Sequence, residues 1–263
     1  MRIFSFFLFI LFISCERNAI TGRRQLNLFP EADLQKQALT EYRSFLNKNK
    51  VIPVASSKQA EMVKRVGLRI SNAITNYYHQ KGLSNELVGY NWEFSLVNSP
   101  EINAWCMPGG KVVVYTGLLD VTKNENALAV VLGHEITHAV AHHGNERLSQ
   151  AFIAEGIQVA GDAFTKNNKQ TNSIFNAVFM PGTQLGVLLP NSRNHELEAD
   201  HFGIIFAAMA GYDPRESVLF WSRMDSQNKN KMPEWLATHP SNEKRIQKLN
   251  ENMEEAMIFY KHQ

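Results

Sequence analysis

The chain has 263 residues, with 27 Lys and Arg against 25 Asp and Glu, and a formal net charge of +2. This length fits one globular domain with a sizeable core. The near balance of charge, without a basic run, gives no indication of nucleic-acid binding. With only two cysteines in the chain, a disulfide framework is excluded.

The first fourteen residues are typical of an export signal. Arg2 precedes an intensely apolar run that ends at Ile13, too short to span a membrane but typical of a signal peptide. Ser14-Cys15 then resembles the cleavage site of a bacterial lipoprotein, although Phe12 stands where leucine is usual. We expect residues 1–14 to be removed and Cys15 to be lipidated. An uncleaved membrane anchor, or ordinary cleavage nearby, is the alternative.

The exported part, residues 15–263, is expected to form a single domain. It contains no apolar run of about eighteen residues, so the sequence predicts no transmembrane helix there. Two helices are predicted near its start. The first covers residues 30–46 and begins with Pro-Glu-Ala-Asp, and the second runs from residue 57 to about 78 with apolar residues at helical spacing. Residues 51–54 are expected to be a linker.

A small sheet is predicted next. Residues 92–97 alternate between apolar and polar, residues 111–115 contain three valines, and residues 108–110 form a Pro-Gly-Gly turn. We place Asn103 and Ala104 on an edge strand with these two strands as neighbours. An edge strand offers unpaired backbone groups to an extended peptide, so both residues are candidate substrate contacts. A purely structural hairpin is the alternative.

The motif His134-Glu135-Ile136-Thr137-His138 carries the most chemical information. Histidines four positions apart share one helix face and can bind one zinc ion, and Glu135 can act as the base that activates a water at the metal. The helix is predicted to start with a capping box at residues 122–125 and to end near Gly144. Its apolar flanks favour a buried metal site over a solvated face with chance histidines.

A catalytic zinc needs a third protein ligand, and the best candidate lies on a second predicted helix. Glu196 and Asp200 share one face of that helix, which ends before Gly211. We expect Glu196 to bind the metal and Asp200 to accept a hydrogen bond from a ligand histidine. Arg193 could neutralise acids near the metal. The alternative for all three residues is a charged surface face with a surface salt bridge.

The remaining candidates are weaker. His142 continues the four-residue spacing, but two helical turns separate it from His134, so it and His143 are expected at the helix C-terminus instead. Cys106 is expected to be a small buried residue. Residues 151–190 join the two metal helices. They are expected to roof the cleft and gate access to it, with a mobile polar stretch at residues 166–172, or else to form a surface loop with a packed helix.

Several blocks of the sequence resemble the M48 family of zinc metallopeptidases, which includes Oma1-like, Ste24-like and bacterial periplasmic members. The matching blocks are HExxH, the later SRxxExEAD, Asn103-Ala104 with Pro108-Gly109-Gly110, Thr238-His239-Pro240-Ser241 with Arg245-Ile246, and Ile20 to Leu26. The resemblance implies that His134, His138 and Glu196 bind one zinc ion per chain and that Glu135 is the catalytic base. It also places His143 on a His-Gly pair that does not bind zinc.

The same resemblance places His239 near the zinc. There it could stabilise the oxyanion, or bind the metal and block the water. The alternative from the residues is a loop histidine before a C-terminal helix over residues 241–257 that Ser241 caps.

Together these observations predict a mainly helical α+β zincin-like fold with a small sheet beside the active-site helix. The implied function is that of a zinc metalloendopeptidase of the gluzincin type. By resemblance, it would cleave misfolded or misassembled proteins of the bacterial envelope in the periplasm, held to a membrane by a lipid anchor. The rival interpretation is an envelope assembly factor or chaperone with a largely latent zinc site. A structural zinc protein is less favoured, because structural sites are usually cysteine-rich and closed.

Overall fold

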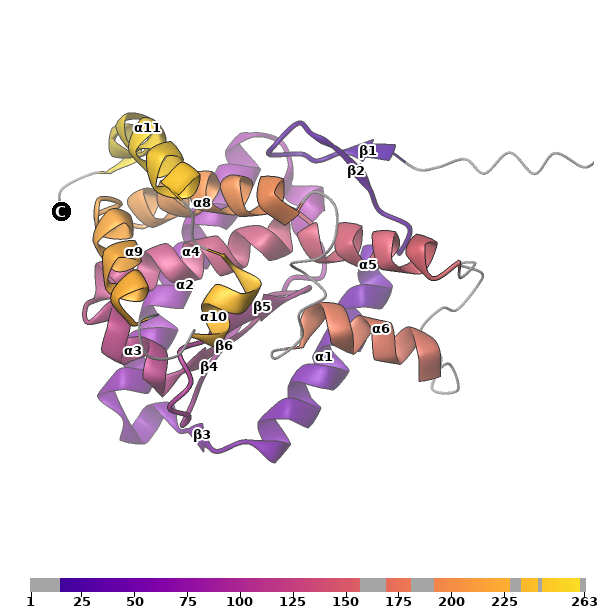
Figure 1. Ribbon diagram of the computed structural model, residues 1–263, viewed down its shortest axis with the longest axis horizontal. Coiled ribbons are helices and arrows are strands. Elements are labelled where there is room, and N and C mark those ends of the chain that lie inside the picture. The colour runs from indigo at the N-terminus through magenta and orange to yellow at the C-terminus, as the bar shows by residue number, and fades with distance from the viewer. Residues whose placement is uncertain (1–14, 157–168, 181–191, 228–232, 241–242, 261–263) are drawn as a thin grey trace, which may run out of the picture.

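The computed structural model describes residues 15–156, 169–180, 192–227, 233–240 and 243–260. They form the predicted α+β fold, in which helices surround a small four-stranded sheet, and a separate two-stranded sheet lies at the start of the described chain (Figure 1). The helices are α1 (Glu31–Lys48), α2 (Lys58–Gln80), α3 (Thr116–Thr122), α4 (Glu125–Val140), α5 (His143–Ala154), α6 (Lys169–Phe179), α8 (Ser192–Met209), α9 (Glu216–Gln227), α10 (Glu234–Thr238) and α11 (Glu243–Phe259). The strands are β1 (Cys15–Arg17), β2 (Arg24–Leu26), β3 (Val51–Ile52), β4 (Glu93–Val97), β5 (Ala104–Met107) and β6 (Lys111–Tyr115).

The four-stranded sheet has the order β3-β4-β6-β5. Strand β5 lies at the edge, as predicted, and pairs antiparallel with β6, but Asn103 directly precedes the strand and is not part of it. The intervening Gly109 and Gly110 have φ values of 77° and 80°, a left-handed conformation that glycine adopts without steric cost. Strand β4 is not a neighbour of β5, contrary to our expectation, because it pairs with the far side of β6 in parallel.

The expected linker at residues 51–54 is also partly wrong. Val51 and Ile52 pair antiparallel with β4 and form the opposite edge strand β3. Both are β-branched residues, which fit a pleated and half-buried surface well, and the Pro that follows them ends the strand. The helices on either side agree with the prediction, and Ser57 caps α2 by accepting a hydrogen bond from the amide of Ala60.

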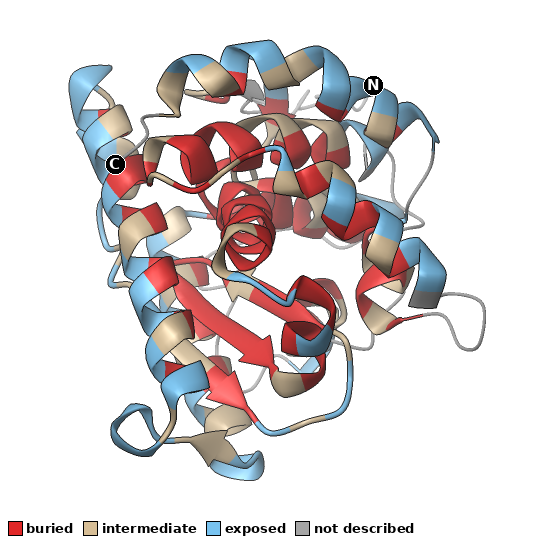
Figure 2. Cartoon of the chain, turned by 90° about the vertical axis from the view of Figure 1, so that its left-hand side faces the viewer, coloured by how far each residue is buried: buried red, intermediate tan, exposed pale blue. Residues whose placement is uncertain are grey.

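Alternating residues of the sheet face two separate cores. Val113 and Tyr115 pack with α1, α5 and α6, whereas Val112 and Val114 pack with α2, α4 and α8. Helix α4 is therefore enclosed by the sheet on one side and by α2 and α8 on others, and Figure 2 shows this central helix buried along its length. This burial explains why its sequence is apolar on all sides apart from the metal motif.

The two ends of α4 differ from the prediction. Its N-cap is Asn124, whose side chain accepts a hydrogen bond from the amide of Ala127, whereas Thr122 ends the preceding α3. At the other end, the helix is interrupted at His142, which has a left-handed φ of 54°. Gly144 lies inside α5 instead of ending α4. His142 thereby separates α4 from α5.

Helices α4 and α8 cross closely because both carry glycine at the crossing. A Cβ atom added to Gly133 would lie 2.4 Å from the carbonyl oxygen of Gly203, and one added to Gly203 would lie 2.8 Å from the amide nitrogen of His134. Any larger residue would therefore push the helices apart. This close approach brings the acids of α8 next to the histidines of α4.

Some predicted segments lie outside the described residues. These are residues 1–14, residues 166–168, the end of the segment that joins the two metal helices, and Ser241. The rest of the predicted mobile stretch, residues 169–172, forms the first turn of α6. None of the helices that the structure describes is long and apolar enough to cross a membrane.

Candidate metal centre

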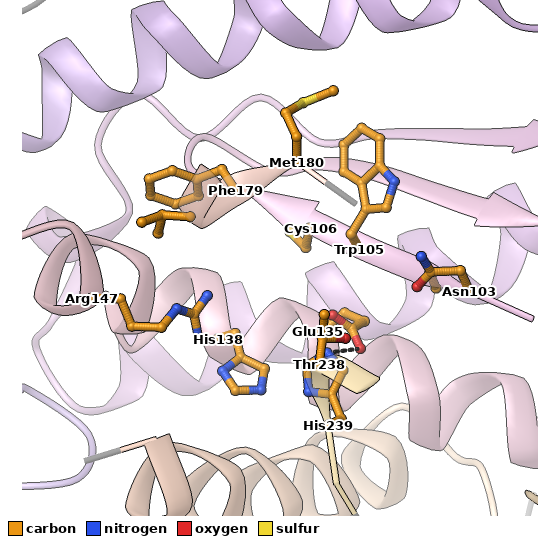
Figure 3. Close-up of a pocket in the computed structure, with 12 residues that line it drawn as sticks. Asn103, Trp105, Cys106, Glu135, His138, Arg147, Phe179, Met180, Thr238 and His239 are labelled. Carbon is orange, nitrogen blue, oxygen red and sulfur yellow. Dashed lines mark ion pairs between the residues drawn. The ribbon is translucent and has the colours of Figure 1, made fainter. Parts of the chain in front are cut away.

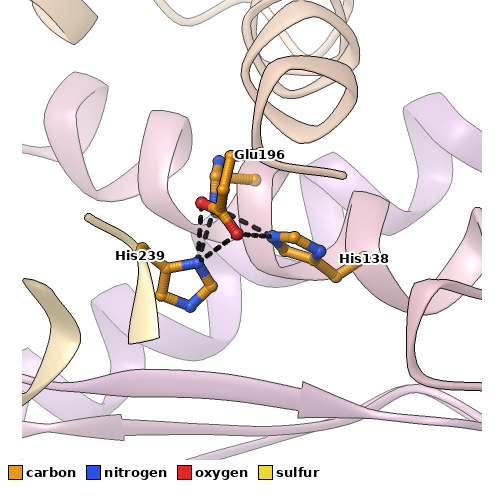
Figure 4. Close-up of side chains that lie close together, drawn as sticks. His138, Glu196 and His239 are labelled. Atoms are coloured by element: carbon orange, nitrogen blue, oxygen red, sulfur yellow. Dashed lines mark hydrogen bonds and ion pairs between the residues drawn. The ribbon is translucent and has the colours of Figure 1, made fainter. Parts of the chain in front are cut away.

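Four buried side chains from three separate segments converge on one point. His134 and His138 come from α4, Glu196 from α8, and His239 directly follows α10. Their nitrogen and oxygen donor atoms all lie within 4.8 Å of one another. Figure 4 shows His138, Glu196 and His239 facing each other across a small gap. The structure thus brings together the residues for which the sequence predicted metal binding, and adds His239 to them.

The spacing of these donors fits a single zinc ion. The Nε2 atoms of His134 and His138 are 3.1 Å apart, and each lies 3.4 Å from an oxygen of Glu196. In a tetrahedral zinc site with bonds of about 2.0–2.1 Å, neighbouring donor atoms are about 3.3 Å apart. Imidazole and carboxylate are donors that zinc prefers. These three side chains could therefore hold a zinc ion.

His239 occupies the position beside these three donors. Its Nδ1 lies 3.2 Å from Nε2 of His134 and 3.0 Å from an oxygen of Glu196. An open catalytic site keeps this fourth position for water. The described arrangement is therefore a closed set of four protein donors.

An acid and an arginine hold the first histidine in place. Nδ1 of His134 lies 3.1 Å from Asp200, as the sequence predicted for this acid. A proton on Nδ1 leaves Nε2 free to face the metal. Arg245, from α11, donates two hydrogen bonds of 2.7 Å to Asp200 and lies 3.0 Å from Glu196. Arg245 is itself buried and stacks over the Trp221 ring at 4.3 Å.

The second histidine is held by a longer chain of contacts. Nδ1 of His138 lies 2.9 Å from Nδ1 of His143, and Nε2 of His143 lies 2.9 Å from Glu198. Glu198 in turn accepts a hydrogen bond of 2.6 Å from Arg23, in the hairpin that precedes α1. Arg23 also binds Glu146, which contacts His195. The amino-terminal hairpin therefore contacts the residues that support the metal centre.

Electrostatics at the centre match binding of a cation. Burial raises the pKa of Glu196, but His239, Arg245 and His138 outweigh it and hold this pKa well below its usual range. Burial opposes the charged form of His134, yet Asp200 and Glu196 prevail and raise its pKa to about 9. Burial keeps the pKa of His138 well below its usual value, so that this ring is neutral and can donate its lone pair.

Glu135 lies beside this group. The indole nitrogen of Trp235, on α10, donates a hydrogen bond of 2.7 Å to it, and Nε2 of His239 lies 3.5 Å away. Helix α10 therefore carries the residue that orients the expected base, and the fourth donor directly follows this helix. Trp235 could not be predicted as a site residue, because nothing in its local sequence pattern separates it from an ordinary core residue.

A cavity runs along the edge strand past Glu135 and His138 (Figure 3). The β5 side is lined by Asn103, Ala104, Trp105 and Cys106. Across from the strand lie Val178, Phe179 and Met180, from the end of α6 and the residue after it. The end of α6 and the residue after it therefore line the cavity, which fits both the expected roof and the alternative of a packed helix.

Two expectations need correction or extension. Arg193, which we expected to neutralise acids near the metal, is exposed on the first turn of α8, and Arg245 takes that place because α11 packs along α8. His143 lies after the end of α4, as expected, but also contacts a ligand histidine, which its spacing did not reveal. Cys106 is half-buried beside the cavity, and burial raises the pKa of its thiol well above the usual value.

Comparison with known proteins agrees with the geometry. The sequence profile described as "Peptidase family M48" matches residues 58–253. The chain is 36% identical to the mitochondrial metalloendopeptidase OMA1 of Arabidopsis thaliana over 68% of this chain and 35% of that protein. It is 29% identical to the human OMA1 metalloendopeptidase over 95% of this chain and 48% of that protein. It is 28% identical to the beta-barrel assembly-enhancing protease of Yersinia pestis, over 86% of this chain and 48% of that protein. The chain thus spans between a third and a half of the length of these relatives.

Proposed function

Since the chain belongs to peptidase family M48, we propose that it is a zinc-dependent endopeptidase. The observation that carries this proposal is the convergence of His134, His138 and Glu196 beside Glu135, next to an edge strand. This arrangement combines a metal site, a base and a surface for an extended peptide.

Each residue then has a defined role. A zinc ion bound by His134, His138 and Glu196 supplies the Lewis acidity that polarises the scissile carbonyl and acidifies water. Glu135 takes the proton of the attacking water and passes it to the leaving amine. Asp200 and His143 keep the two ligand histidines in the tautomers whose Nε2 lone pairs face the metal.

The substrate is held by the edge strand. Among the strands that the structure describes, Ala104 to Met107 pair only with β6, so their other side can pair with an extended peptide. Asn103 and Ala104 line the cavity beside Glu135 and are the proposed contacts to the backbone near the cleaved bond.

Replacing Glu135 by Gln tests the proposal. We expect the variant to bind zinc like the parent, because Glu135 is not among the ligands, and to lose cleavage of casein or a peptide. Metal content and proteolysis of the purified chain are measured side by side. Cleavage at the parent rate by Glu135→Gln would refute the assignment of the base.

A latent form of the same site is favoured by the position of His239. Its Nδ1 lies 3.2 Å from Nε2 of His134 and 3.0 Å from an oxygen of Glu196, which supports the proposal that His239 takes the fourth position that a water would have at a bound metal. The proposed resting state is therefore inhibited, and activity requires His239 to leave the metal. A chaperone or assembly role with a permanently closed site is the second candidate function. It predicts assembly defects that Glu135→Gln does not reproduce.

The envelope location is also a proposal. It is supported by the apolar run before Ser14-Cys15 and by the relative named as a beta-barrel assembly-enhancing protease. The proposed substrates are misfolded or misassembled envelope proteins, and the proposed anchor is a lipid on Cys15. Replacing Cys15 by Ala should move the protein from the membrane fraction to the soluble fraction. Unchanged fractionation would refute the lipid anchor without affecting the proposed protease.

A further inference from the structure

The cavity beside the metal centre contains a charged residue that the proposed mechanism does not use. Arg147, on α5, lines the cavity, and its guanidinium points into it (Figure 3). Arg147 also lines a second, smaller cavity with Cys106, Pro108 and Phe179, which does not include Glu135. Arg147 therefore lies toward the Met107 end of β5, away from Asn103.

Arg147 makes no hydrogen bond or ion pair with any residue that the structure describes. Its Nε atom is fully buried and has no acceptor. Arg147 as a whole is only half-buried, but leaving its buried Nε–H group without an acceptor is costly, because the lost hydration of that group is not replaced. Burial accordingly lowers its pKa, and Glu196, Glu135 and Glu146 offset this only at longer range.

The acids nearest to Arg147 already have partners other than Arg147. Glu146 binds Arg23, and Glu196 binds Arg245. Glu135 accepts its hydrogen bond from Trp235. The charge of Arg147 is thus available to an anion that enters the cavity from outside.

We propose that Arg147 determines specificity by binding the carboxylate of an acidic side chain of the peptide substrate. This inference rests on the proposed endopeptidase function and names a preference of that same site. The cavity has a volume of about 80 Å³. One water requires only about 10–15 Å³, so a carboxylate group fits.

The walls of the cavity strengthen this interaction. Trp105, Phe179 and Met180 are apolar and reduce the local dielectric constant around the guanidinium. The planar guanidinium can form two parallel hydrogen bonds to a carboxylate, which an amide side chain of the same shape cannot match in charge. The site therefore distinguishes Glu from Gln and Asp from Asn.

The direction of β5 predicts on which side of the cleaved bond the acid lies. Antiparallel pairing is the more stable arrangement for an added strand. A peptide that pairs antiparallel with β5 has its amino-terminal part at the Met107 end and its carboxy-terminal part at the Asn103 end. Since Arg147 lies toward Met107, the acidic residue precedes the cleaved bond.

Binding tests this inference without relying on catalysis. The Glu135→Gln full chain, loaded with zinc, is titrated with pairs of fluorescent peptides that differ only in Glu against Gln before the bond. We expect about tenfold tighter binding of the Glu peptide at low salt. Arg147→Met should reduce the difference to less than twofold, and Arg147→Lys should retain part of it because the charge remains. Arg43→Met, at an exposed site on α1, is the matched control and should leave the difference unchanged.

The outcomes separate this inference from the proposed function. Equal binding of both peptides, including no binding of either, overturns the role of Arg147. A preference for the Glu peptide that remains in Arg147→Met would also overturn it. The same holds for a preference that appears only when Glu follows the cleaved bond. In contrast, failure of both the parent chain and His239→Ala to cleave any peptide, acidic or neutral, would count against the endopeptidase. The binding result would still test the role of Arg147.

Discussion

The Nδ1 atoms of His138 and His143 lie 2.9 Å apart, so one of the two rings must donate a proton to the other. If His138 donates, its Nε2 keeps a lone pair that faces the metal. His143 then carries its own proton on Nε2, where Glu198 accepts it at 2.9 Å. If His143 donated instead, Nε2 of His138 would be protonated and could not bind a metal. Glu198 thus selects the tautomer of a residue with which it has no contact.

This relationship makes His143 a positioning residue for zinc. Replacing it by Ala should lower zinc affinity about 10–100-fold, because outer hydrogen-bond partners fix ligand orientation to that extent. The affinity is measured by competition with a chelator, together with a thermal scan of the metal-free protein. His142→Asn is the control, since asparagine tolerates the left-handed backbone at this position. Equal loss of zinc affinity in both variants would contradict the positioning role.

The ion pair of Arg245 with Asp200 should dominate the stability of the metal-free protein. Arg245→Met leaves two buried carboxylates, Asp200 and Glu196, without this cation. Breaking a buried pair in this way costs about 3–5 kcal/mol in the free energy of unfolding. Denaturant unfolding measures this loss. Arg215→Met removes an exposed pair with Asp213 and should cost at most about 1 kcal/mol. Similar losses in both variants would contradict the burial argument.

The stability of the protein should fall between neutral and alkaline pH through His142. Burial opposes the charge of this ring, but Glu31 and Glu86 outweigh it and raise its pKa to about 10. A raised folded-state pKa stabilises the protein fully below the unfolded value of about 6.5, and the contribution is lost as pH rises toward 10. Unfolding free energies at several pH values measure the slope. His142→Asn should flatten it, and an unchanged slope would contradict this assignment.

Removal of His239 should increase peptidase activity. In His239→Ala the position beside His134 and Glu196 becomes available to water, while three ligands remain for the metal. We expect a several-fold higher rate together with a modest loss of zinc affinity. The rate is compared at saturating zinc, with Glu135→Gln added as the inactive control. A lower rate at full metal occupancy would instead assign His239 to stabilising the oxyanion.

Much of the fold could be predicted because its signals are local. The 3.6-residue period placed α1, α2 and α8 within a few residues of their observed bounds, and Pro108 with two glycines identified the hairpin. Element ends were less predictable. Thr122 and Asn124 both suit an N-cap, and only packing of α3 against the sheet decides that Asn124 starts α4. The short strand β3 forms because it pairs with β4, and no local sequence pattern predicts this pairing.

The residues of the candidate metal centre likewise fall into those that the sequence predicted and those that only the tertiary structure revealed. Spacing by itself determined that His134 and His138 share one helix face, with a glutamate between them in sequence. It also determined that Glu196 and Asp200 share one face of a second helix. Both could be predicted because helical periodicity is a local property of the chain. Tertiary structure alone decided that Arg245 and not Arg193 faces the acids, that His143 supports His138, and that Trp235 and Arg147 enter the site. These residues act through contacts between segments that are far apart in sequence. Such contacts depend on how closely the helices pack, as at Gly133 and Gly203. No single segment of the sequence specifies this packing.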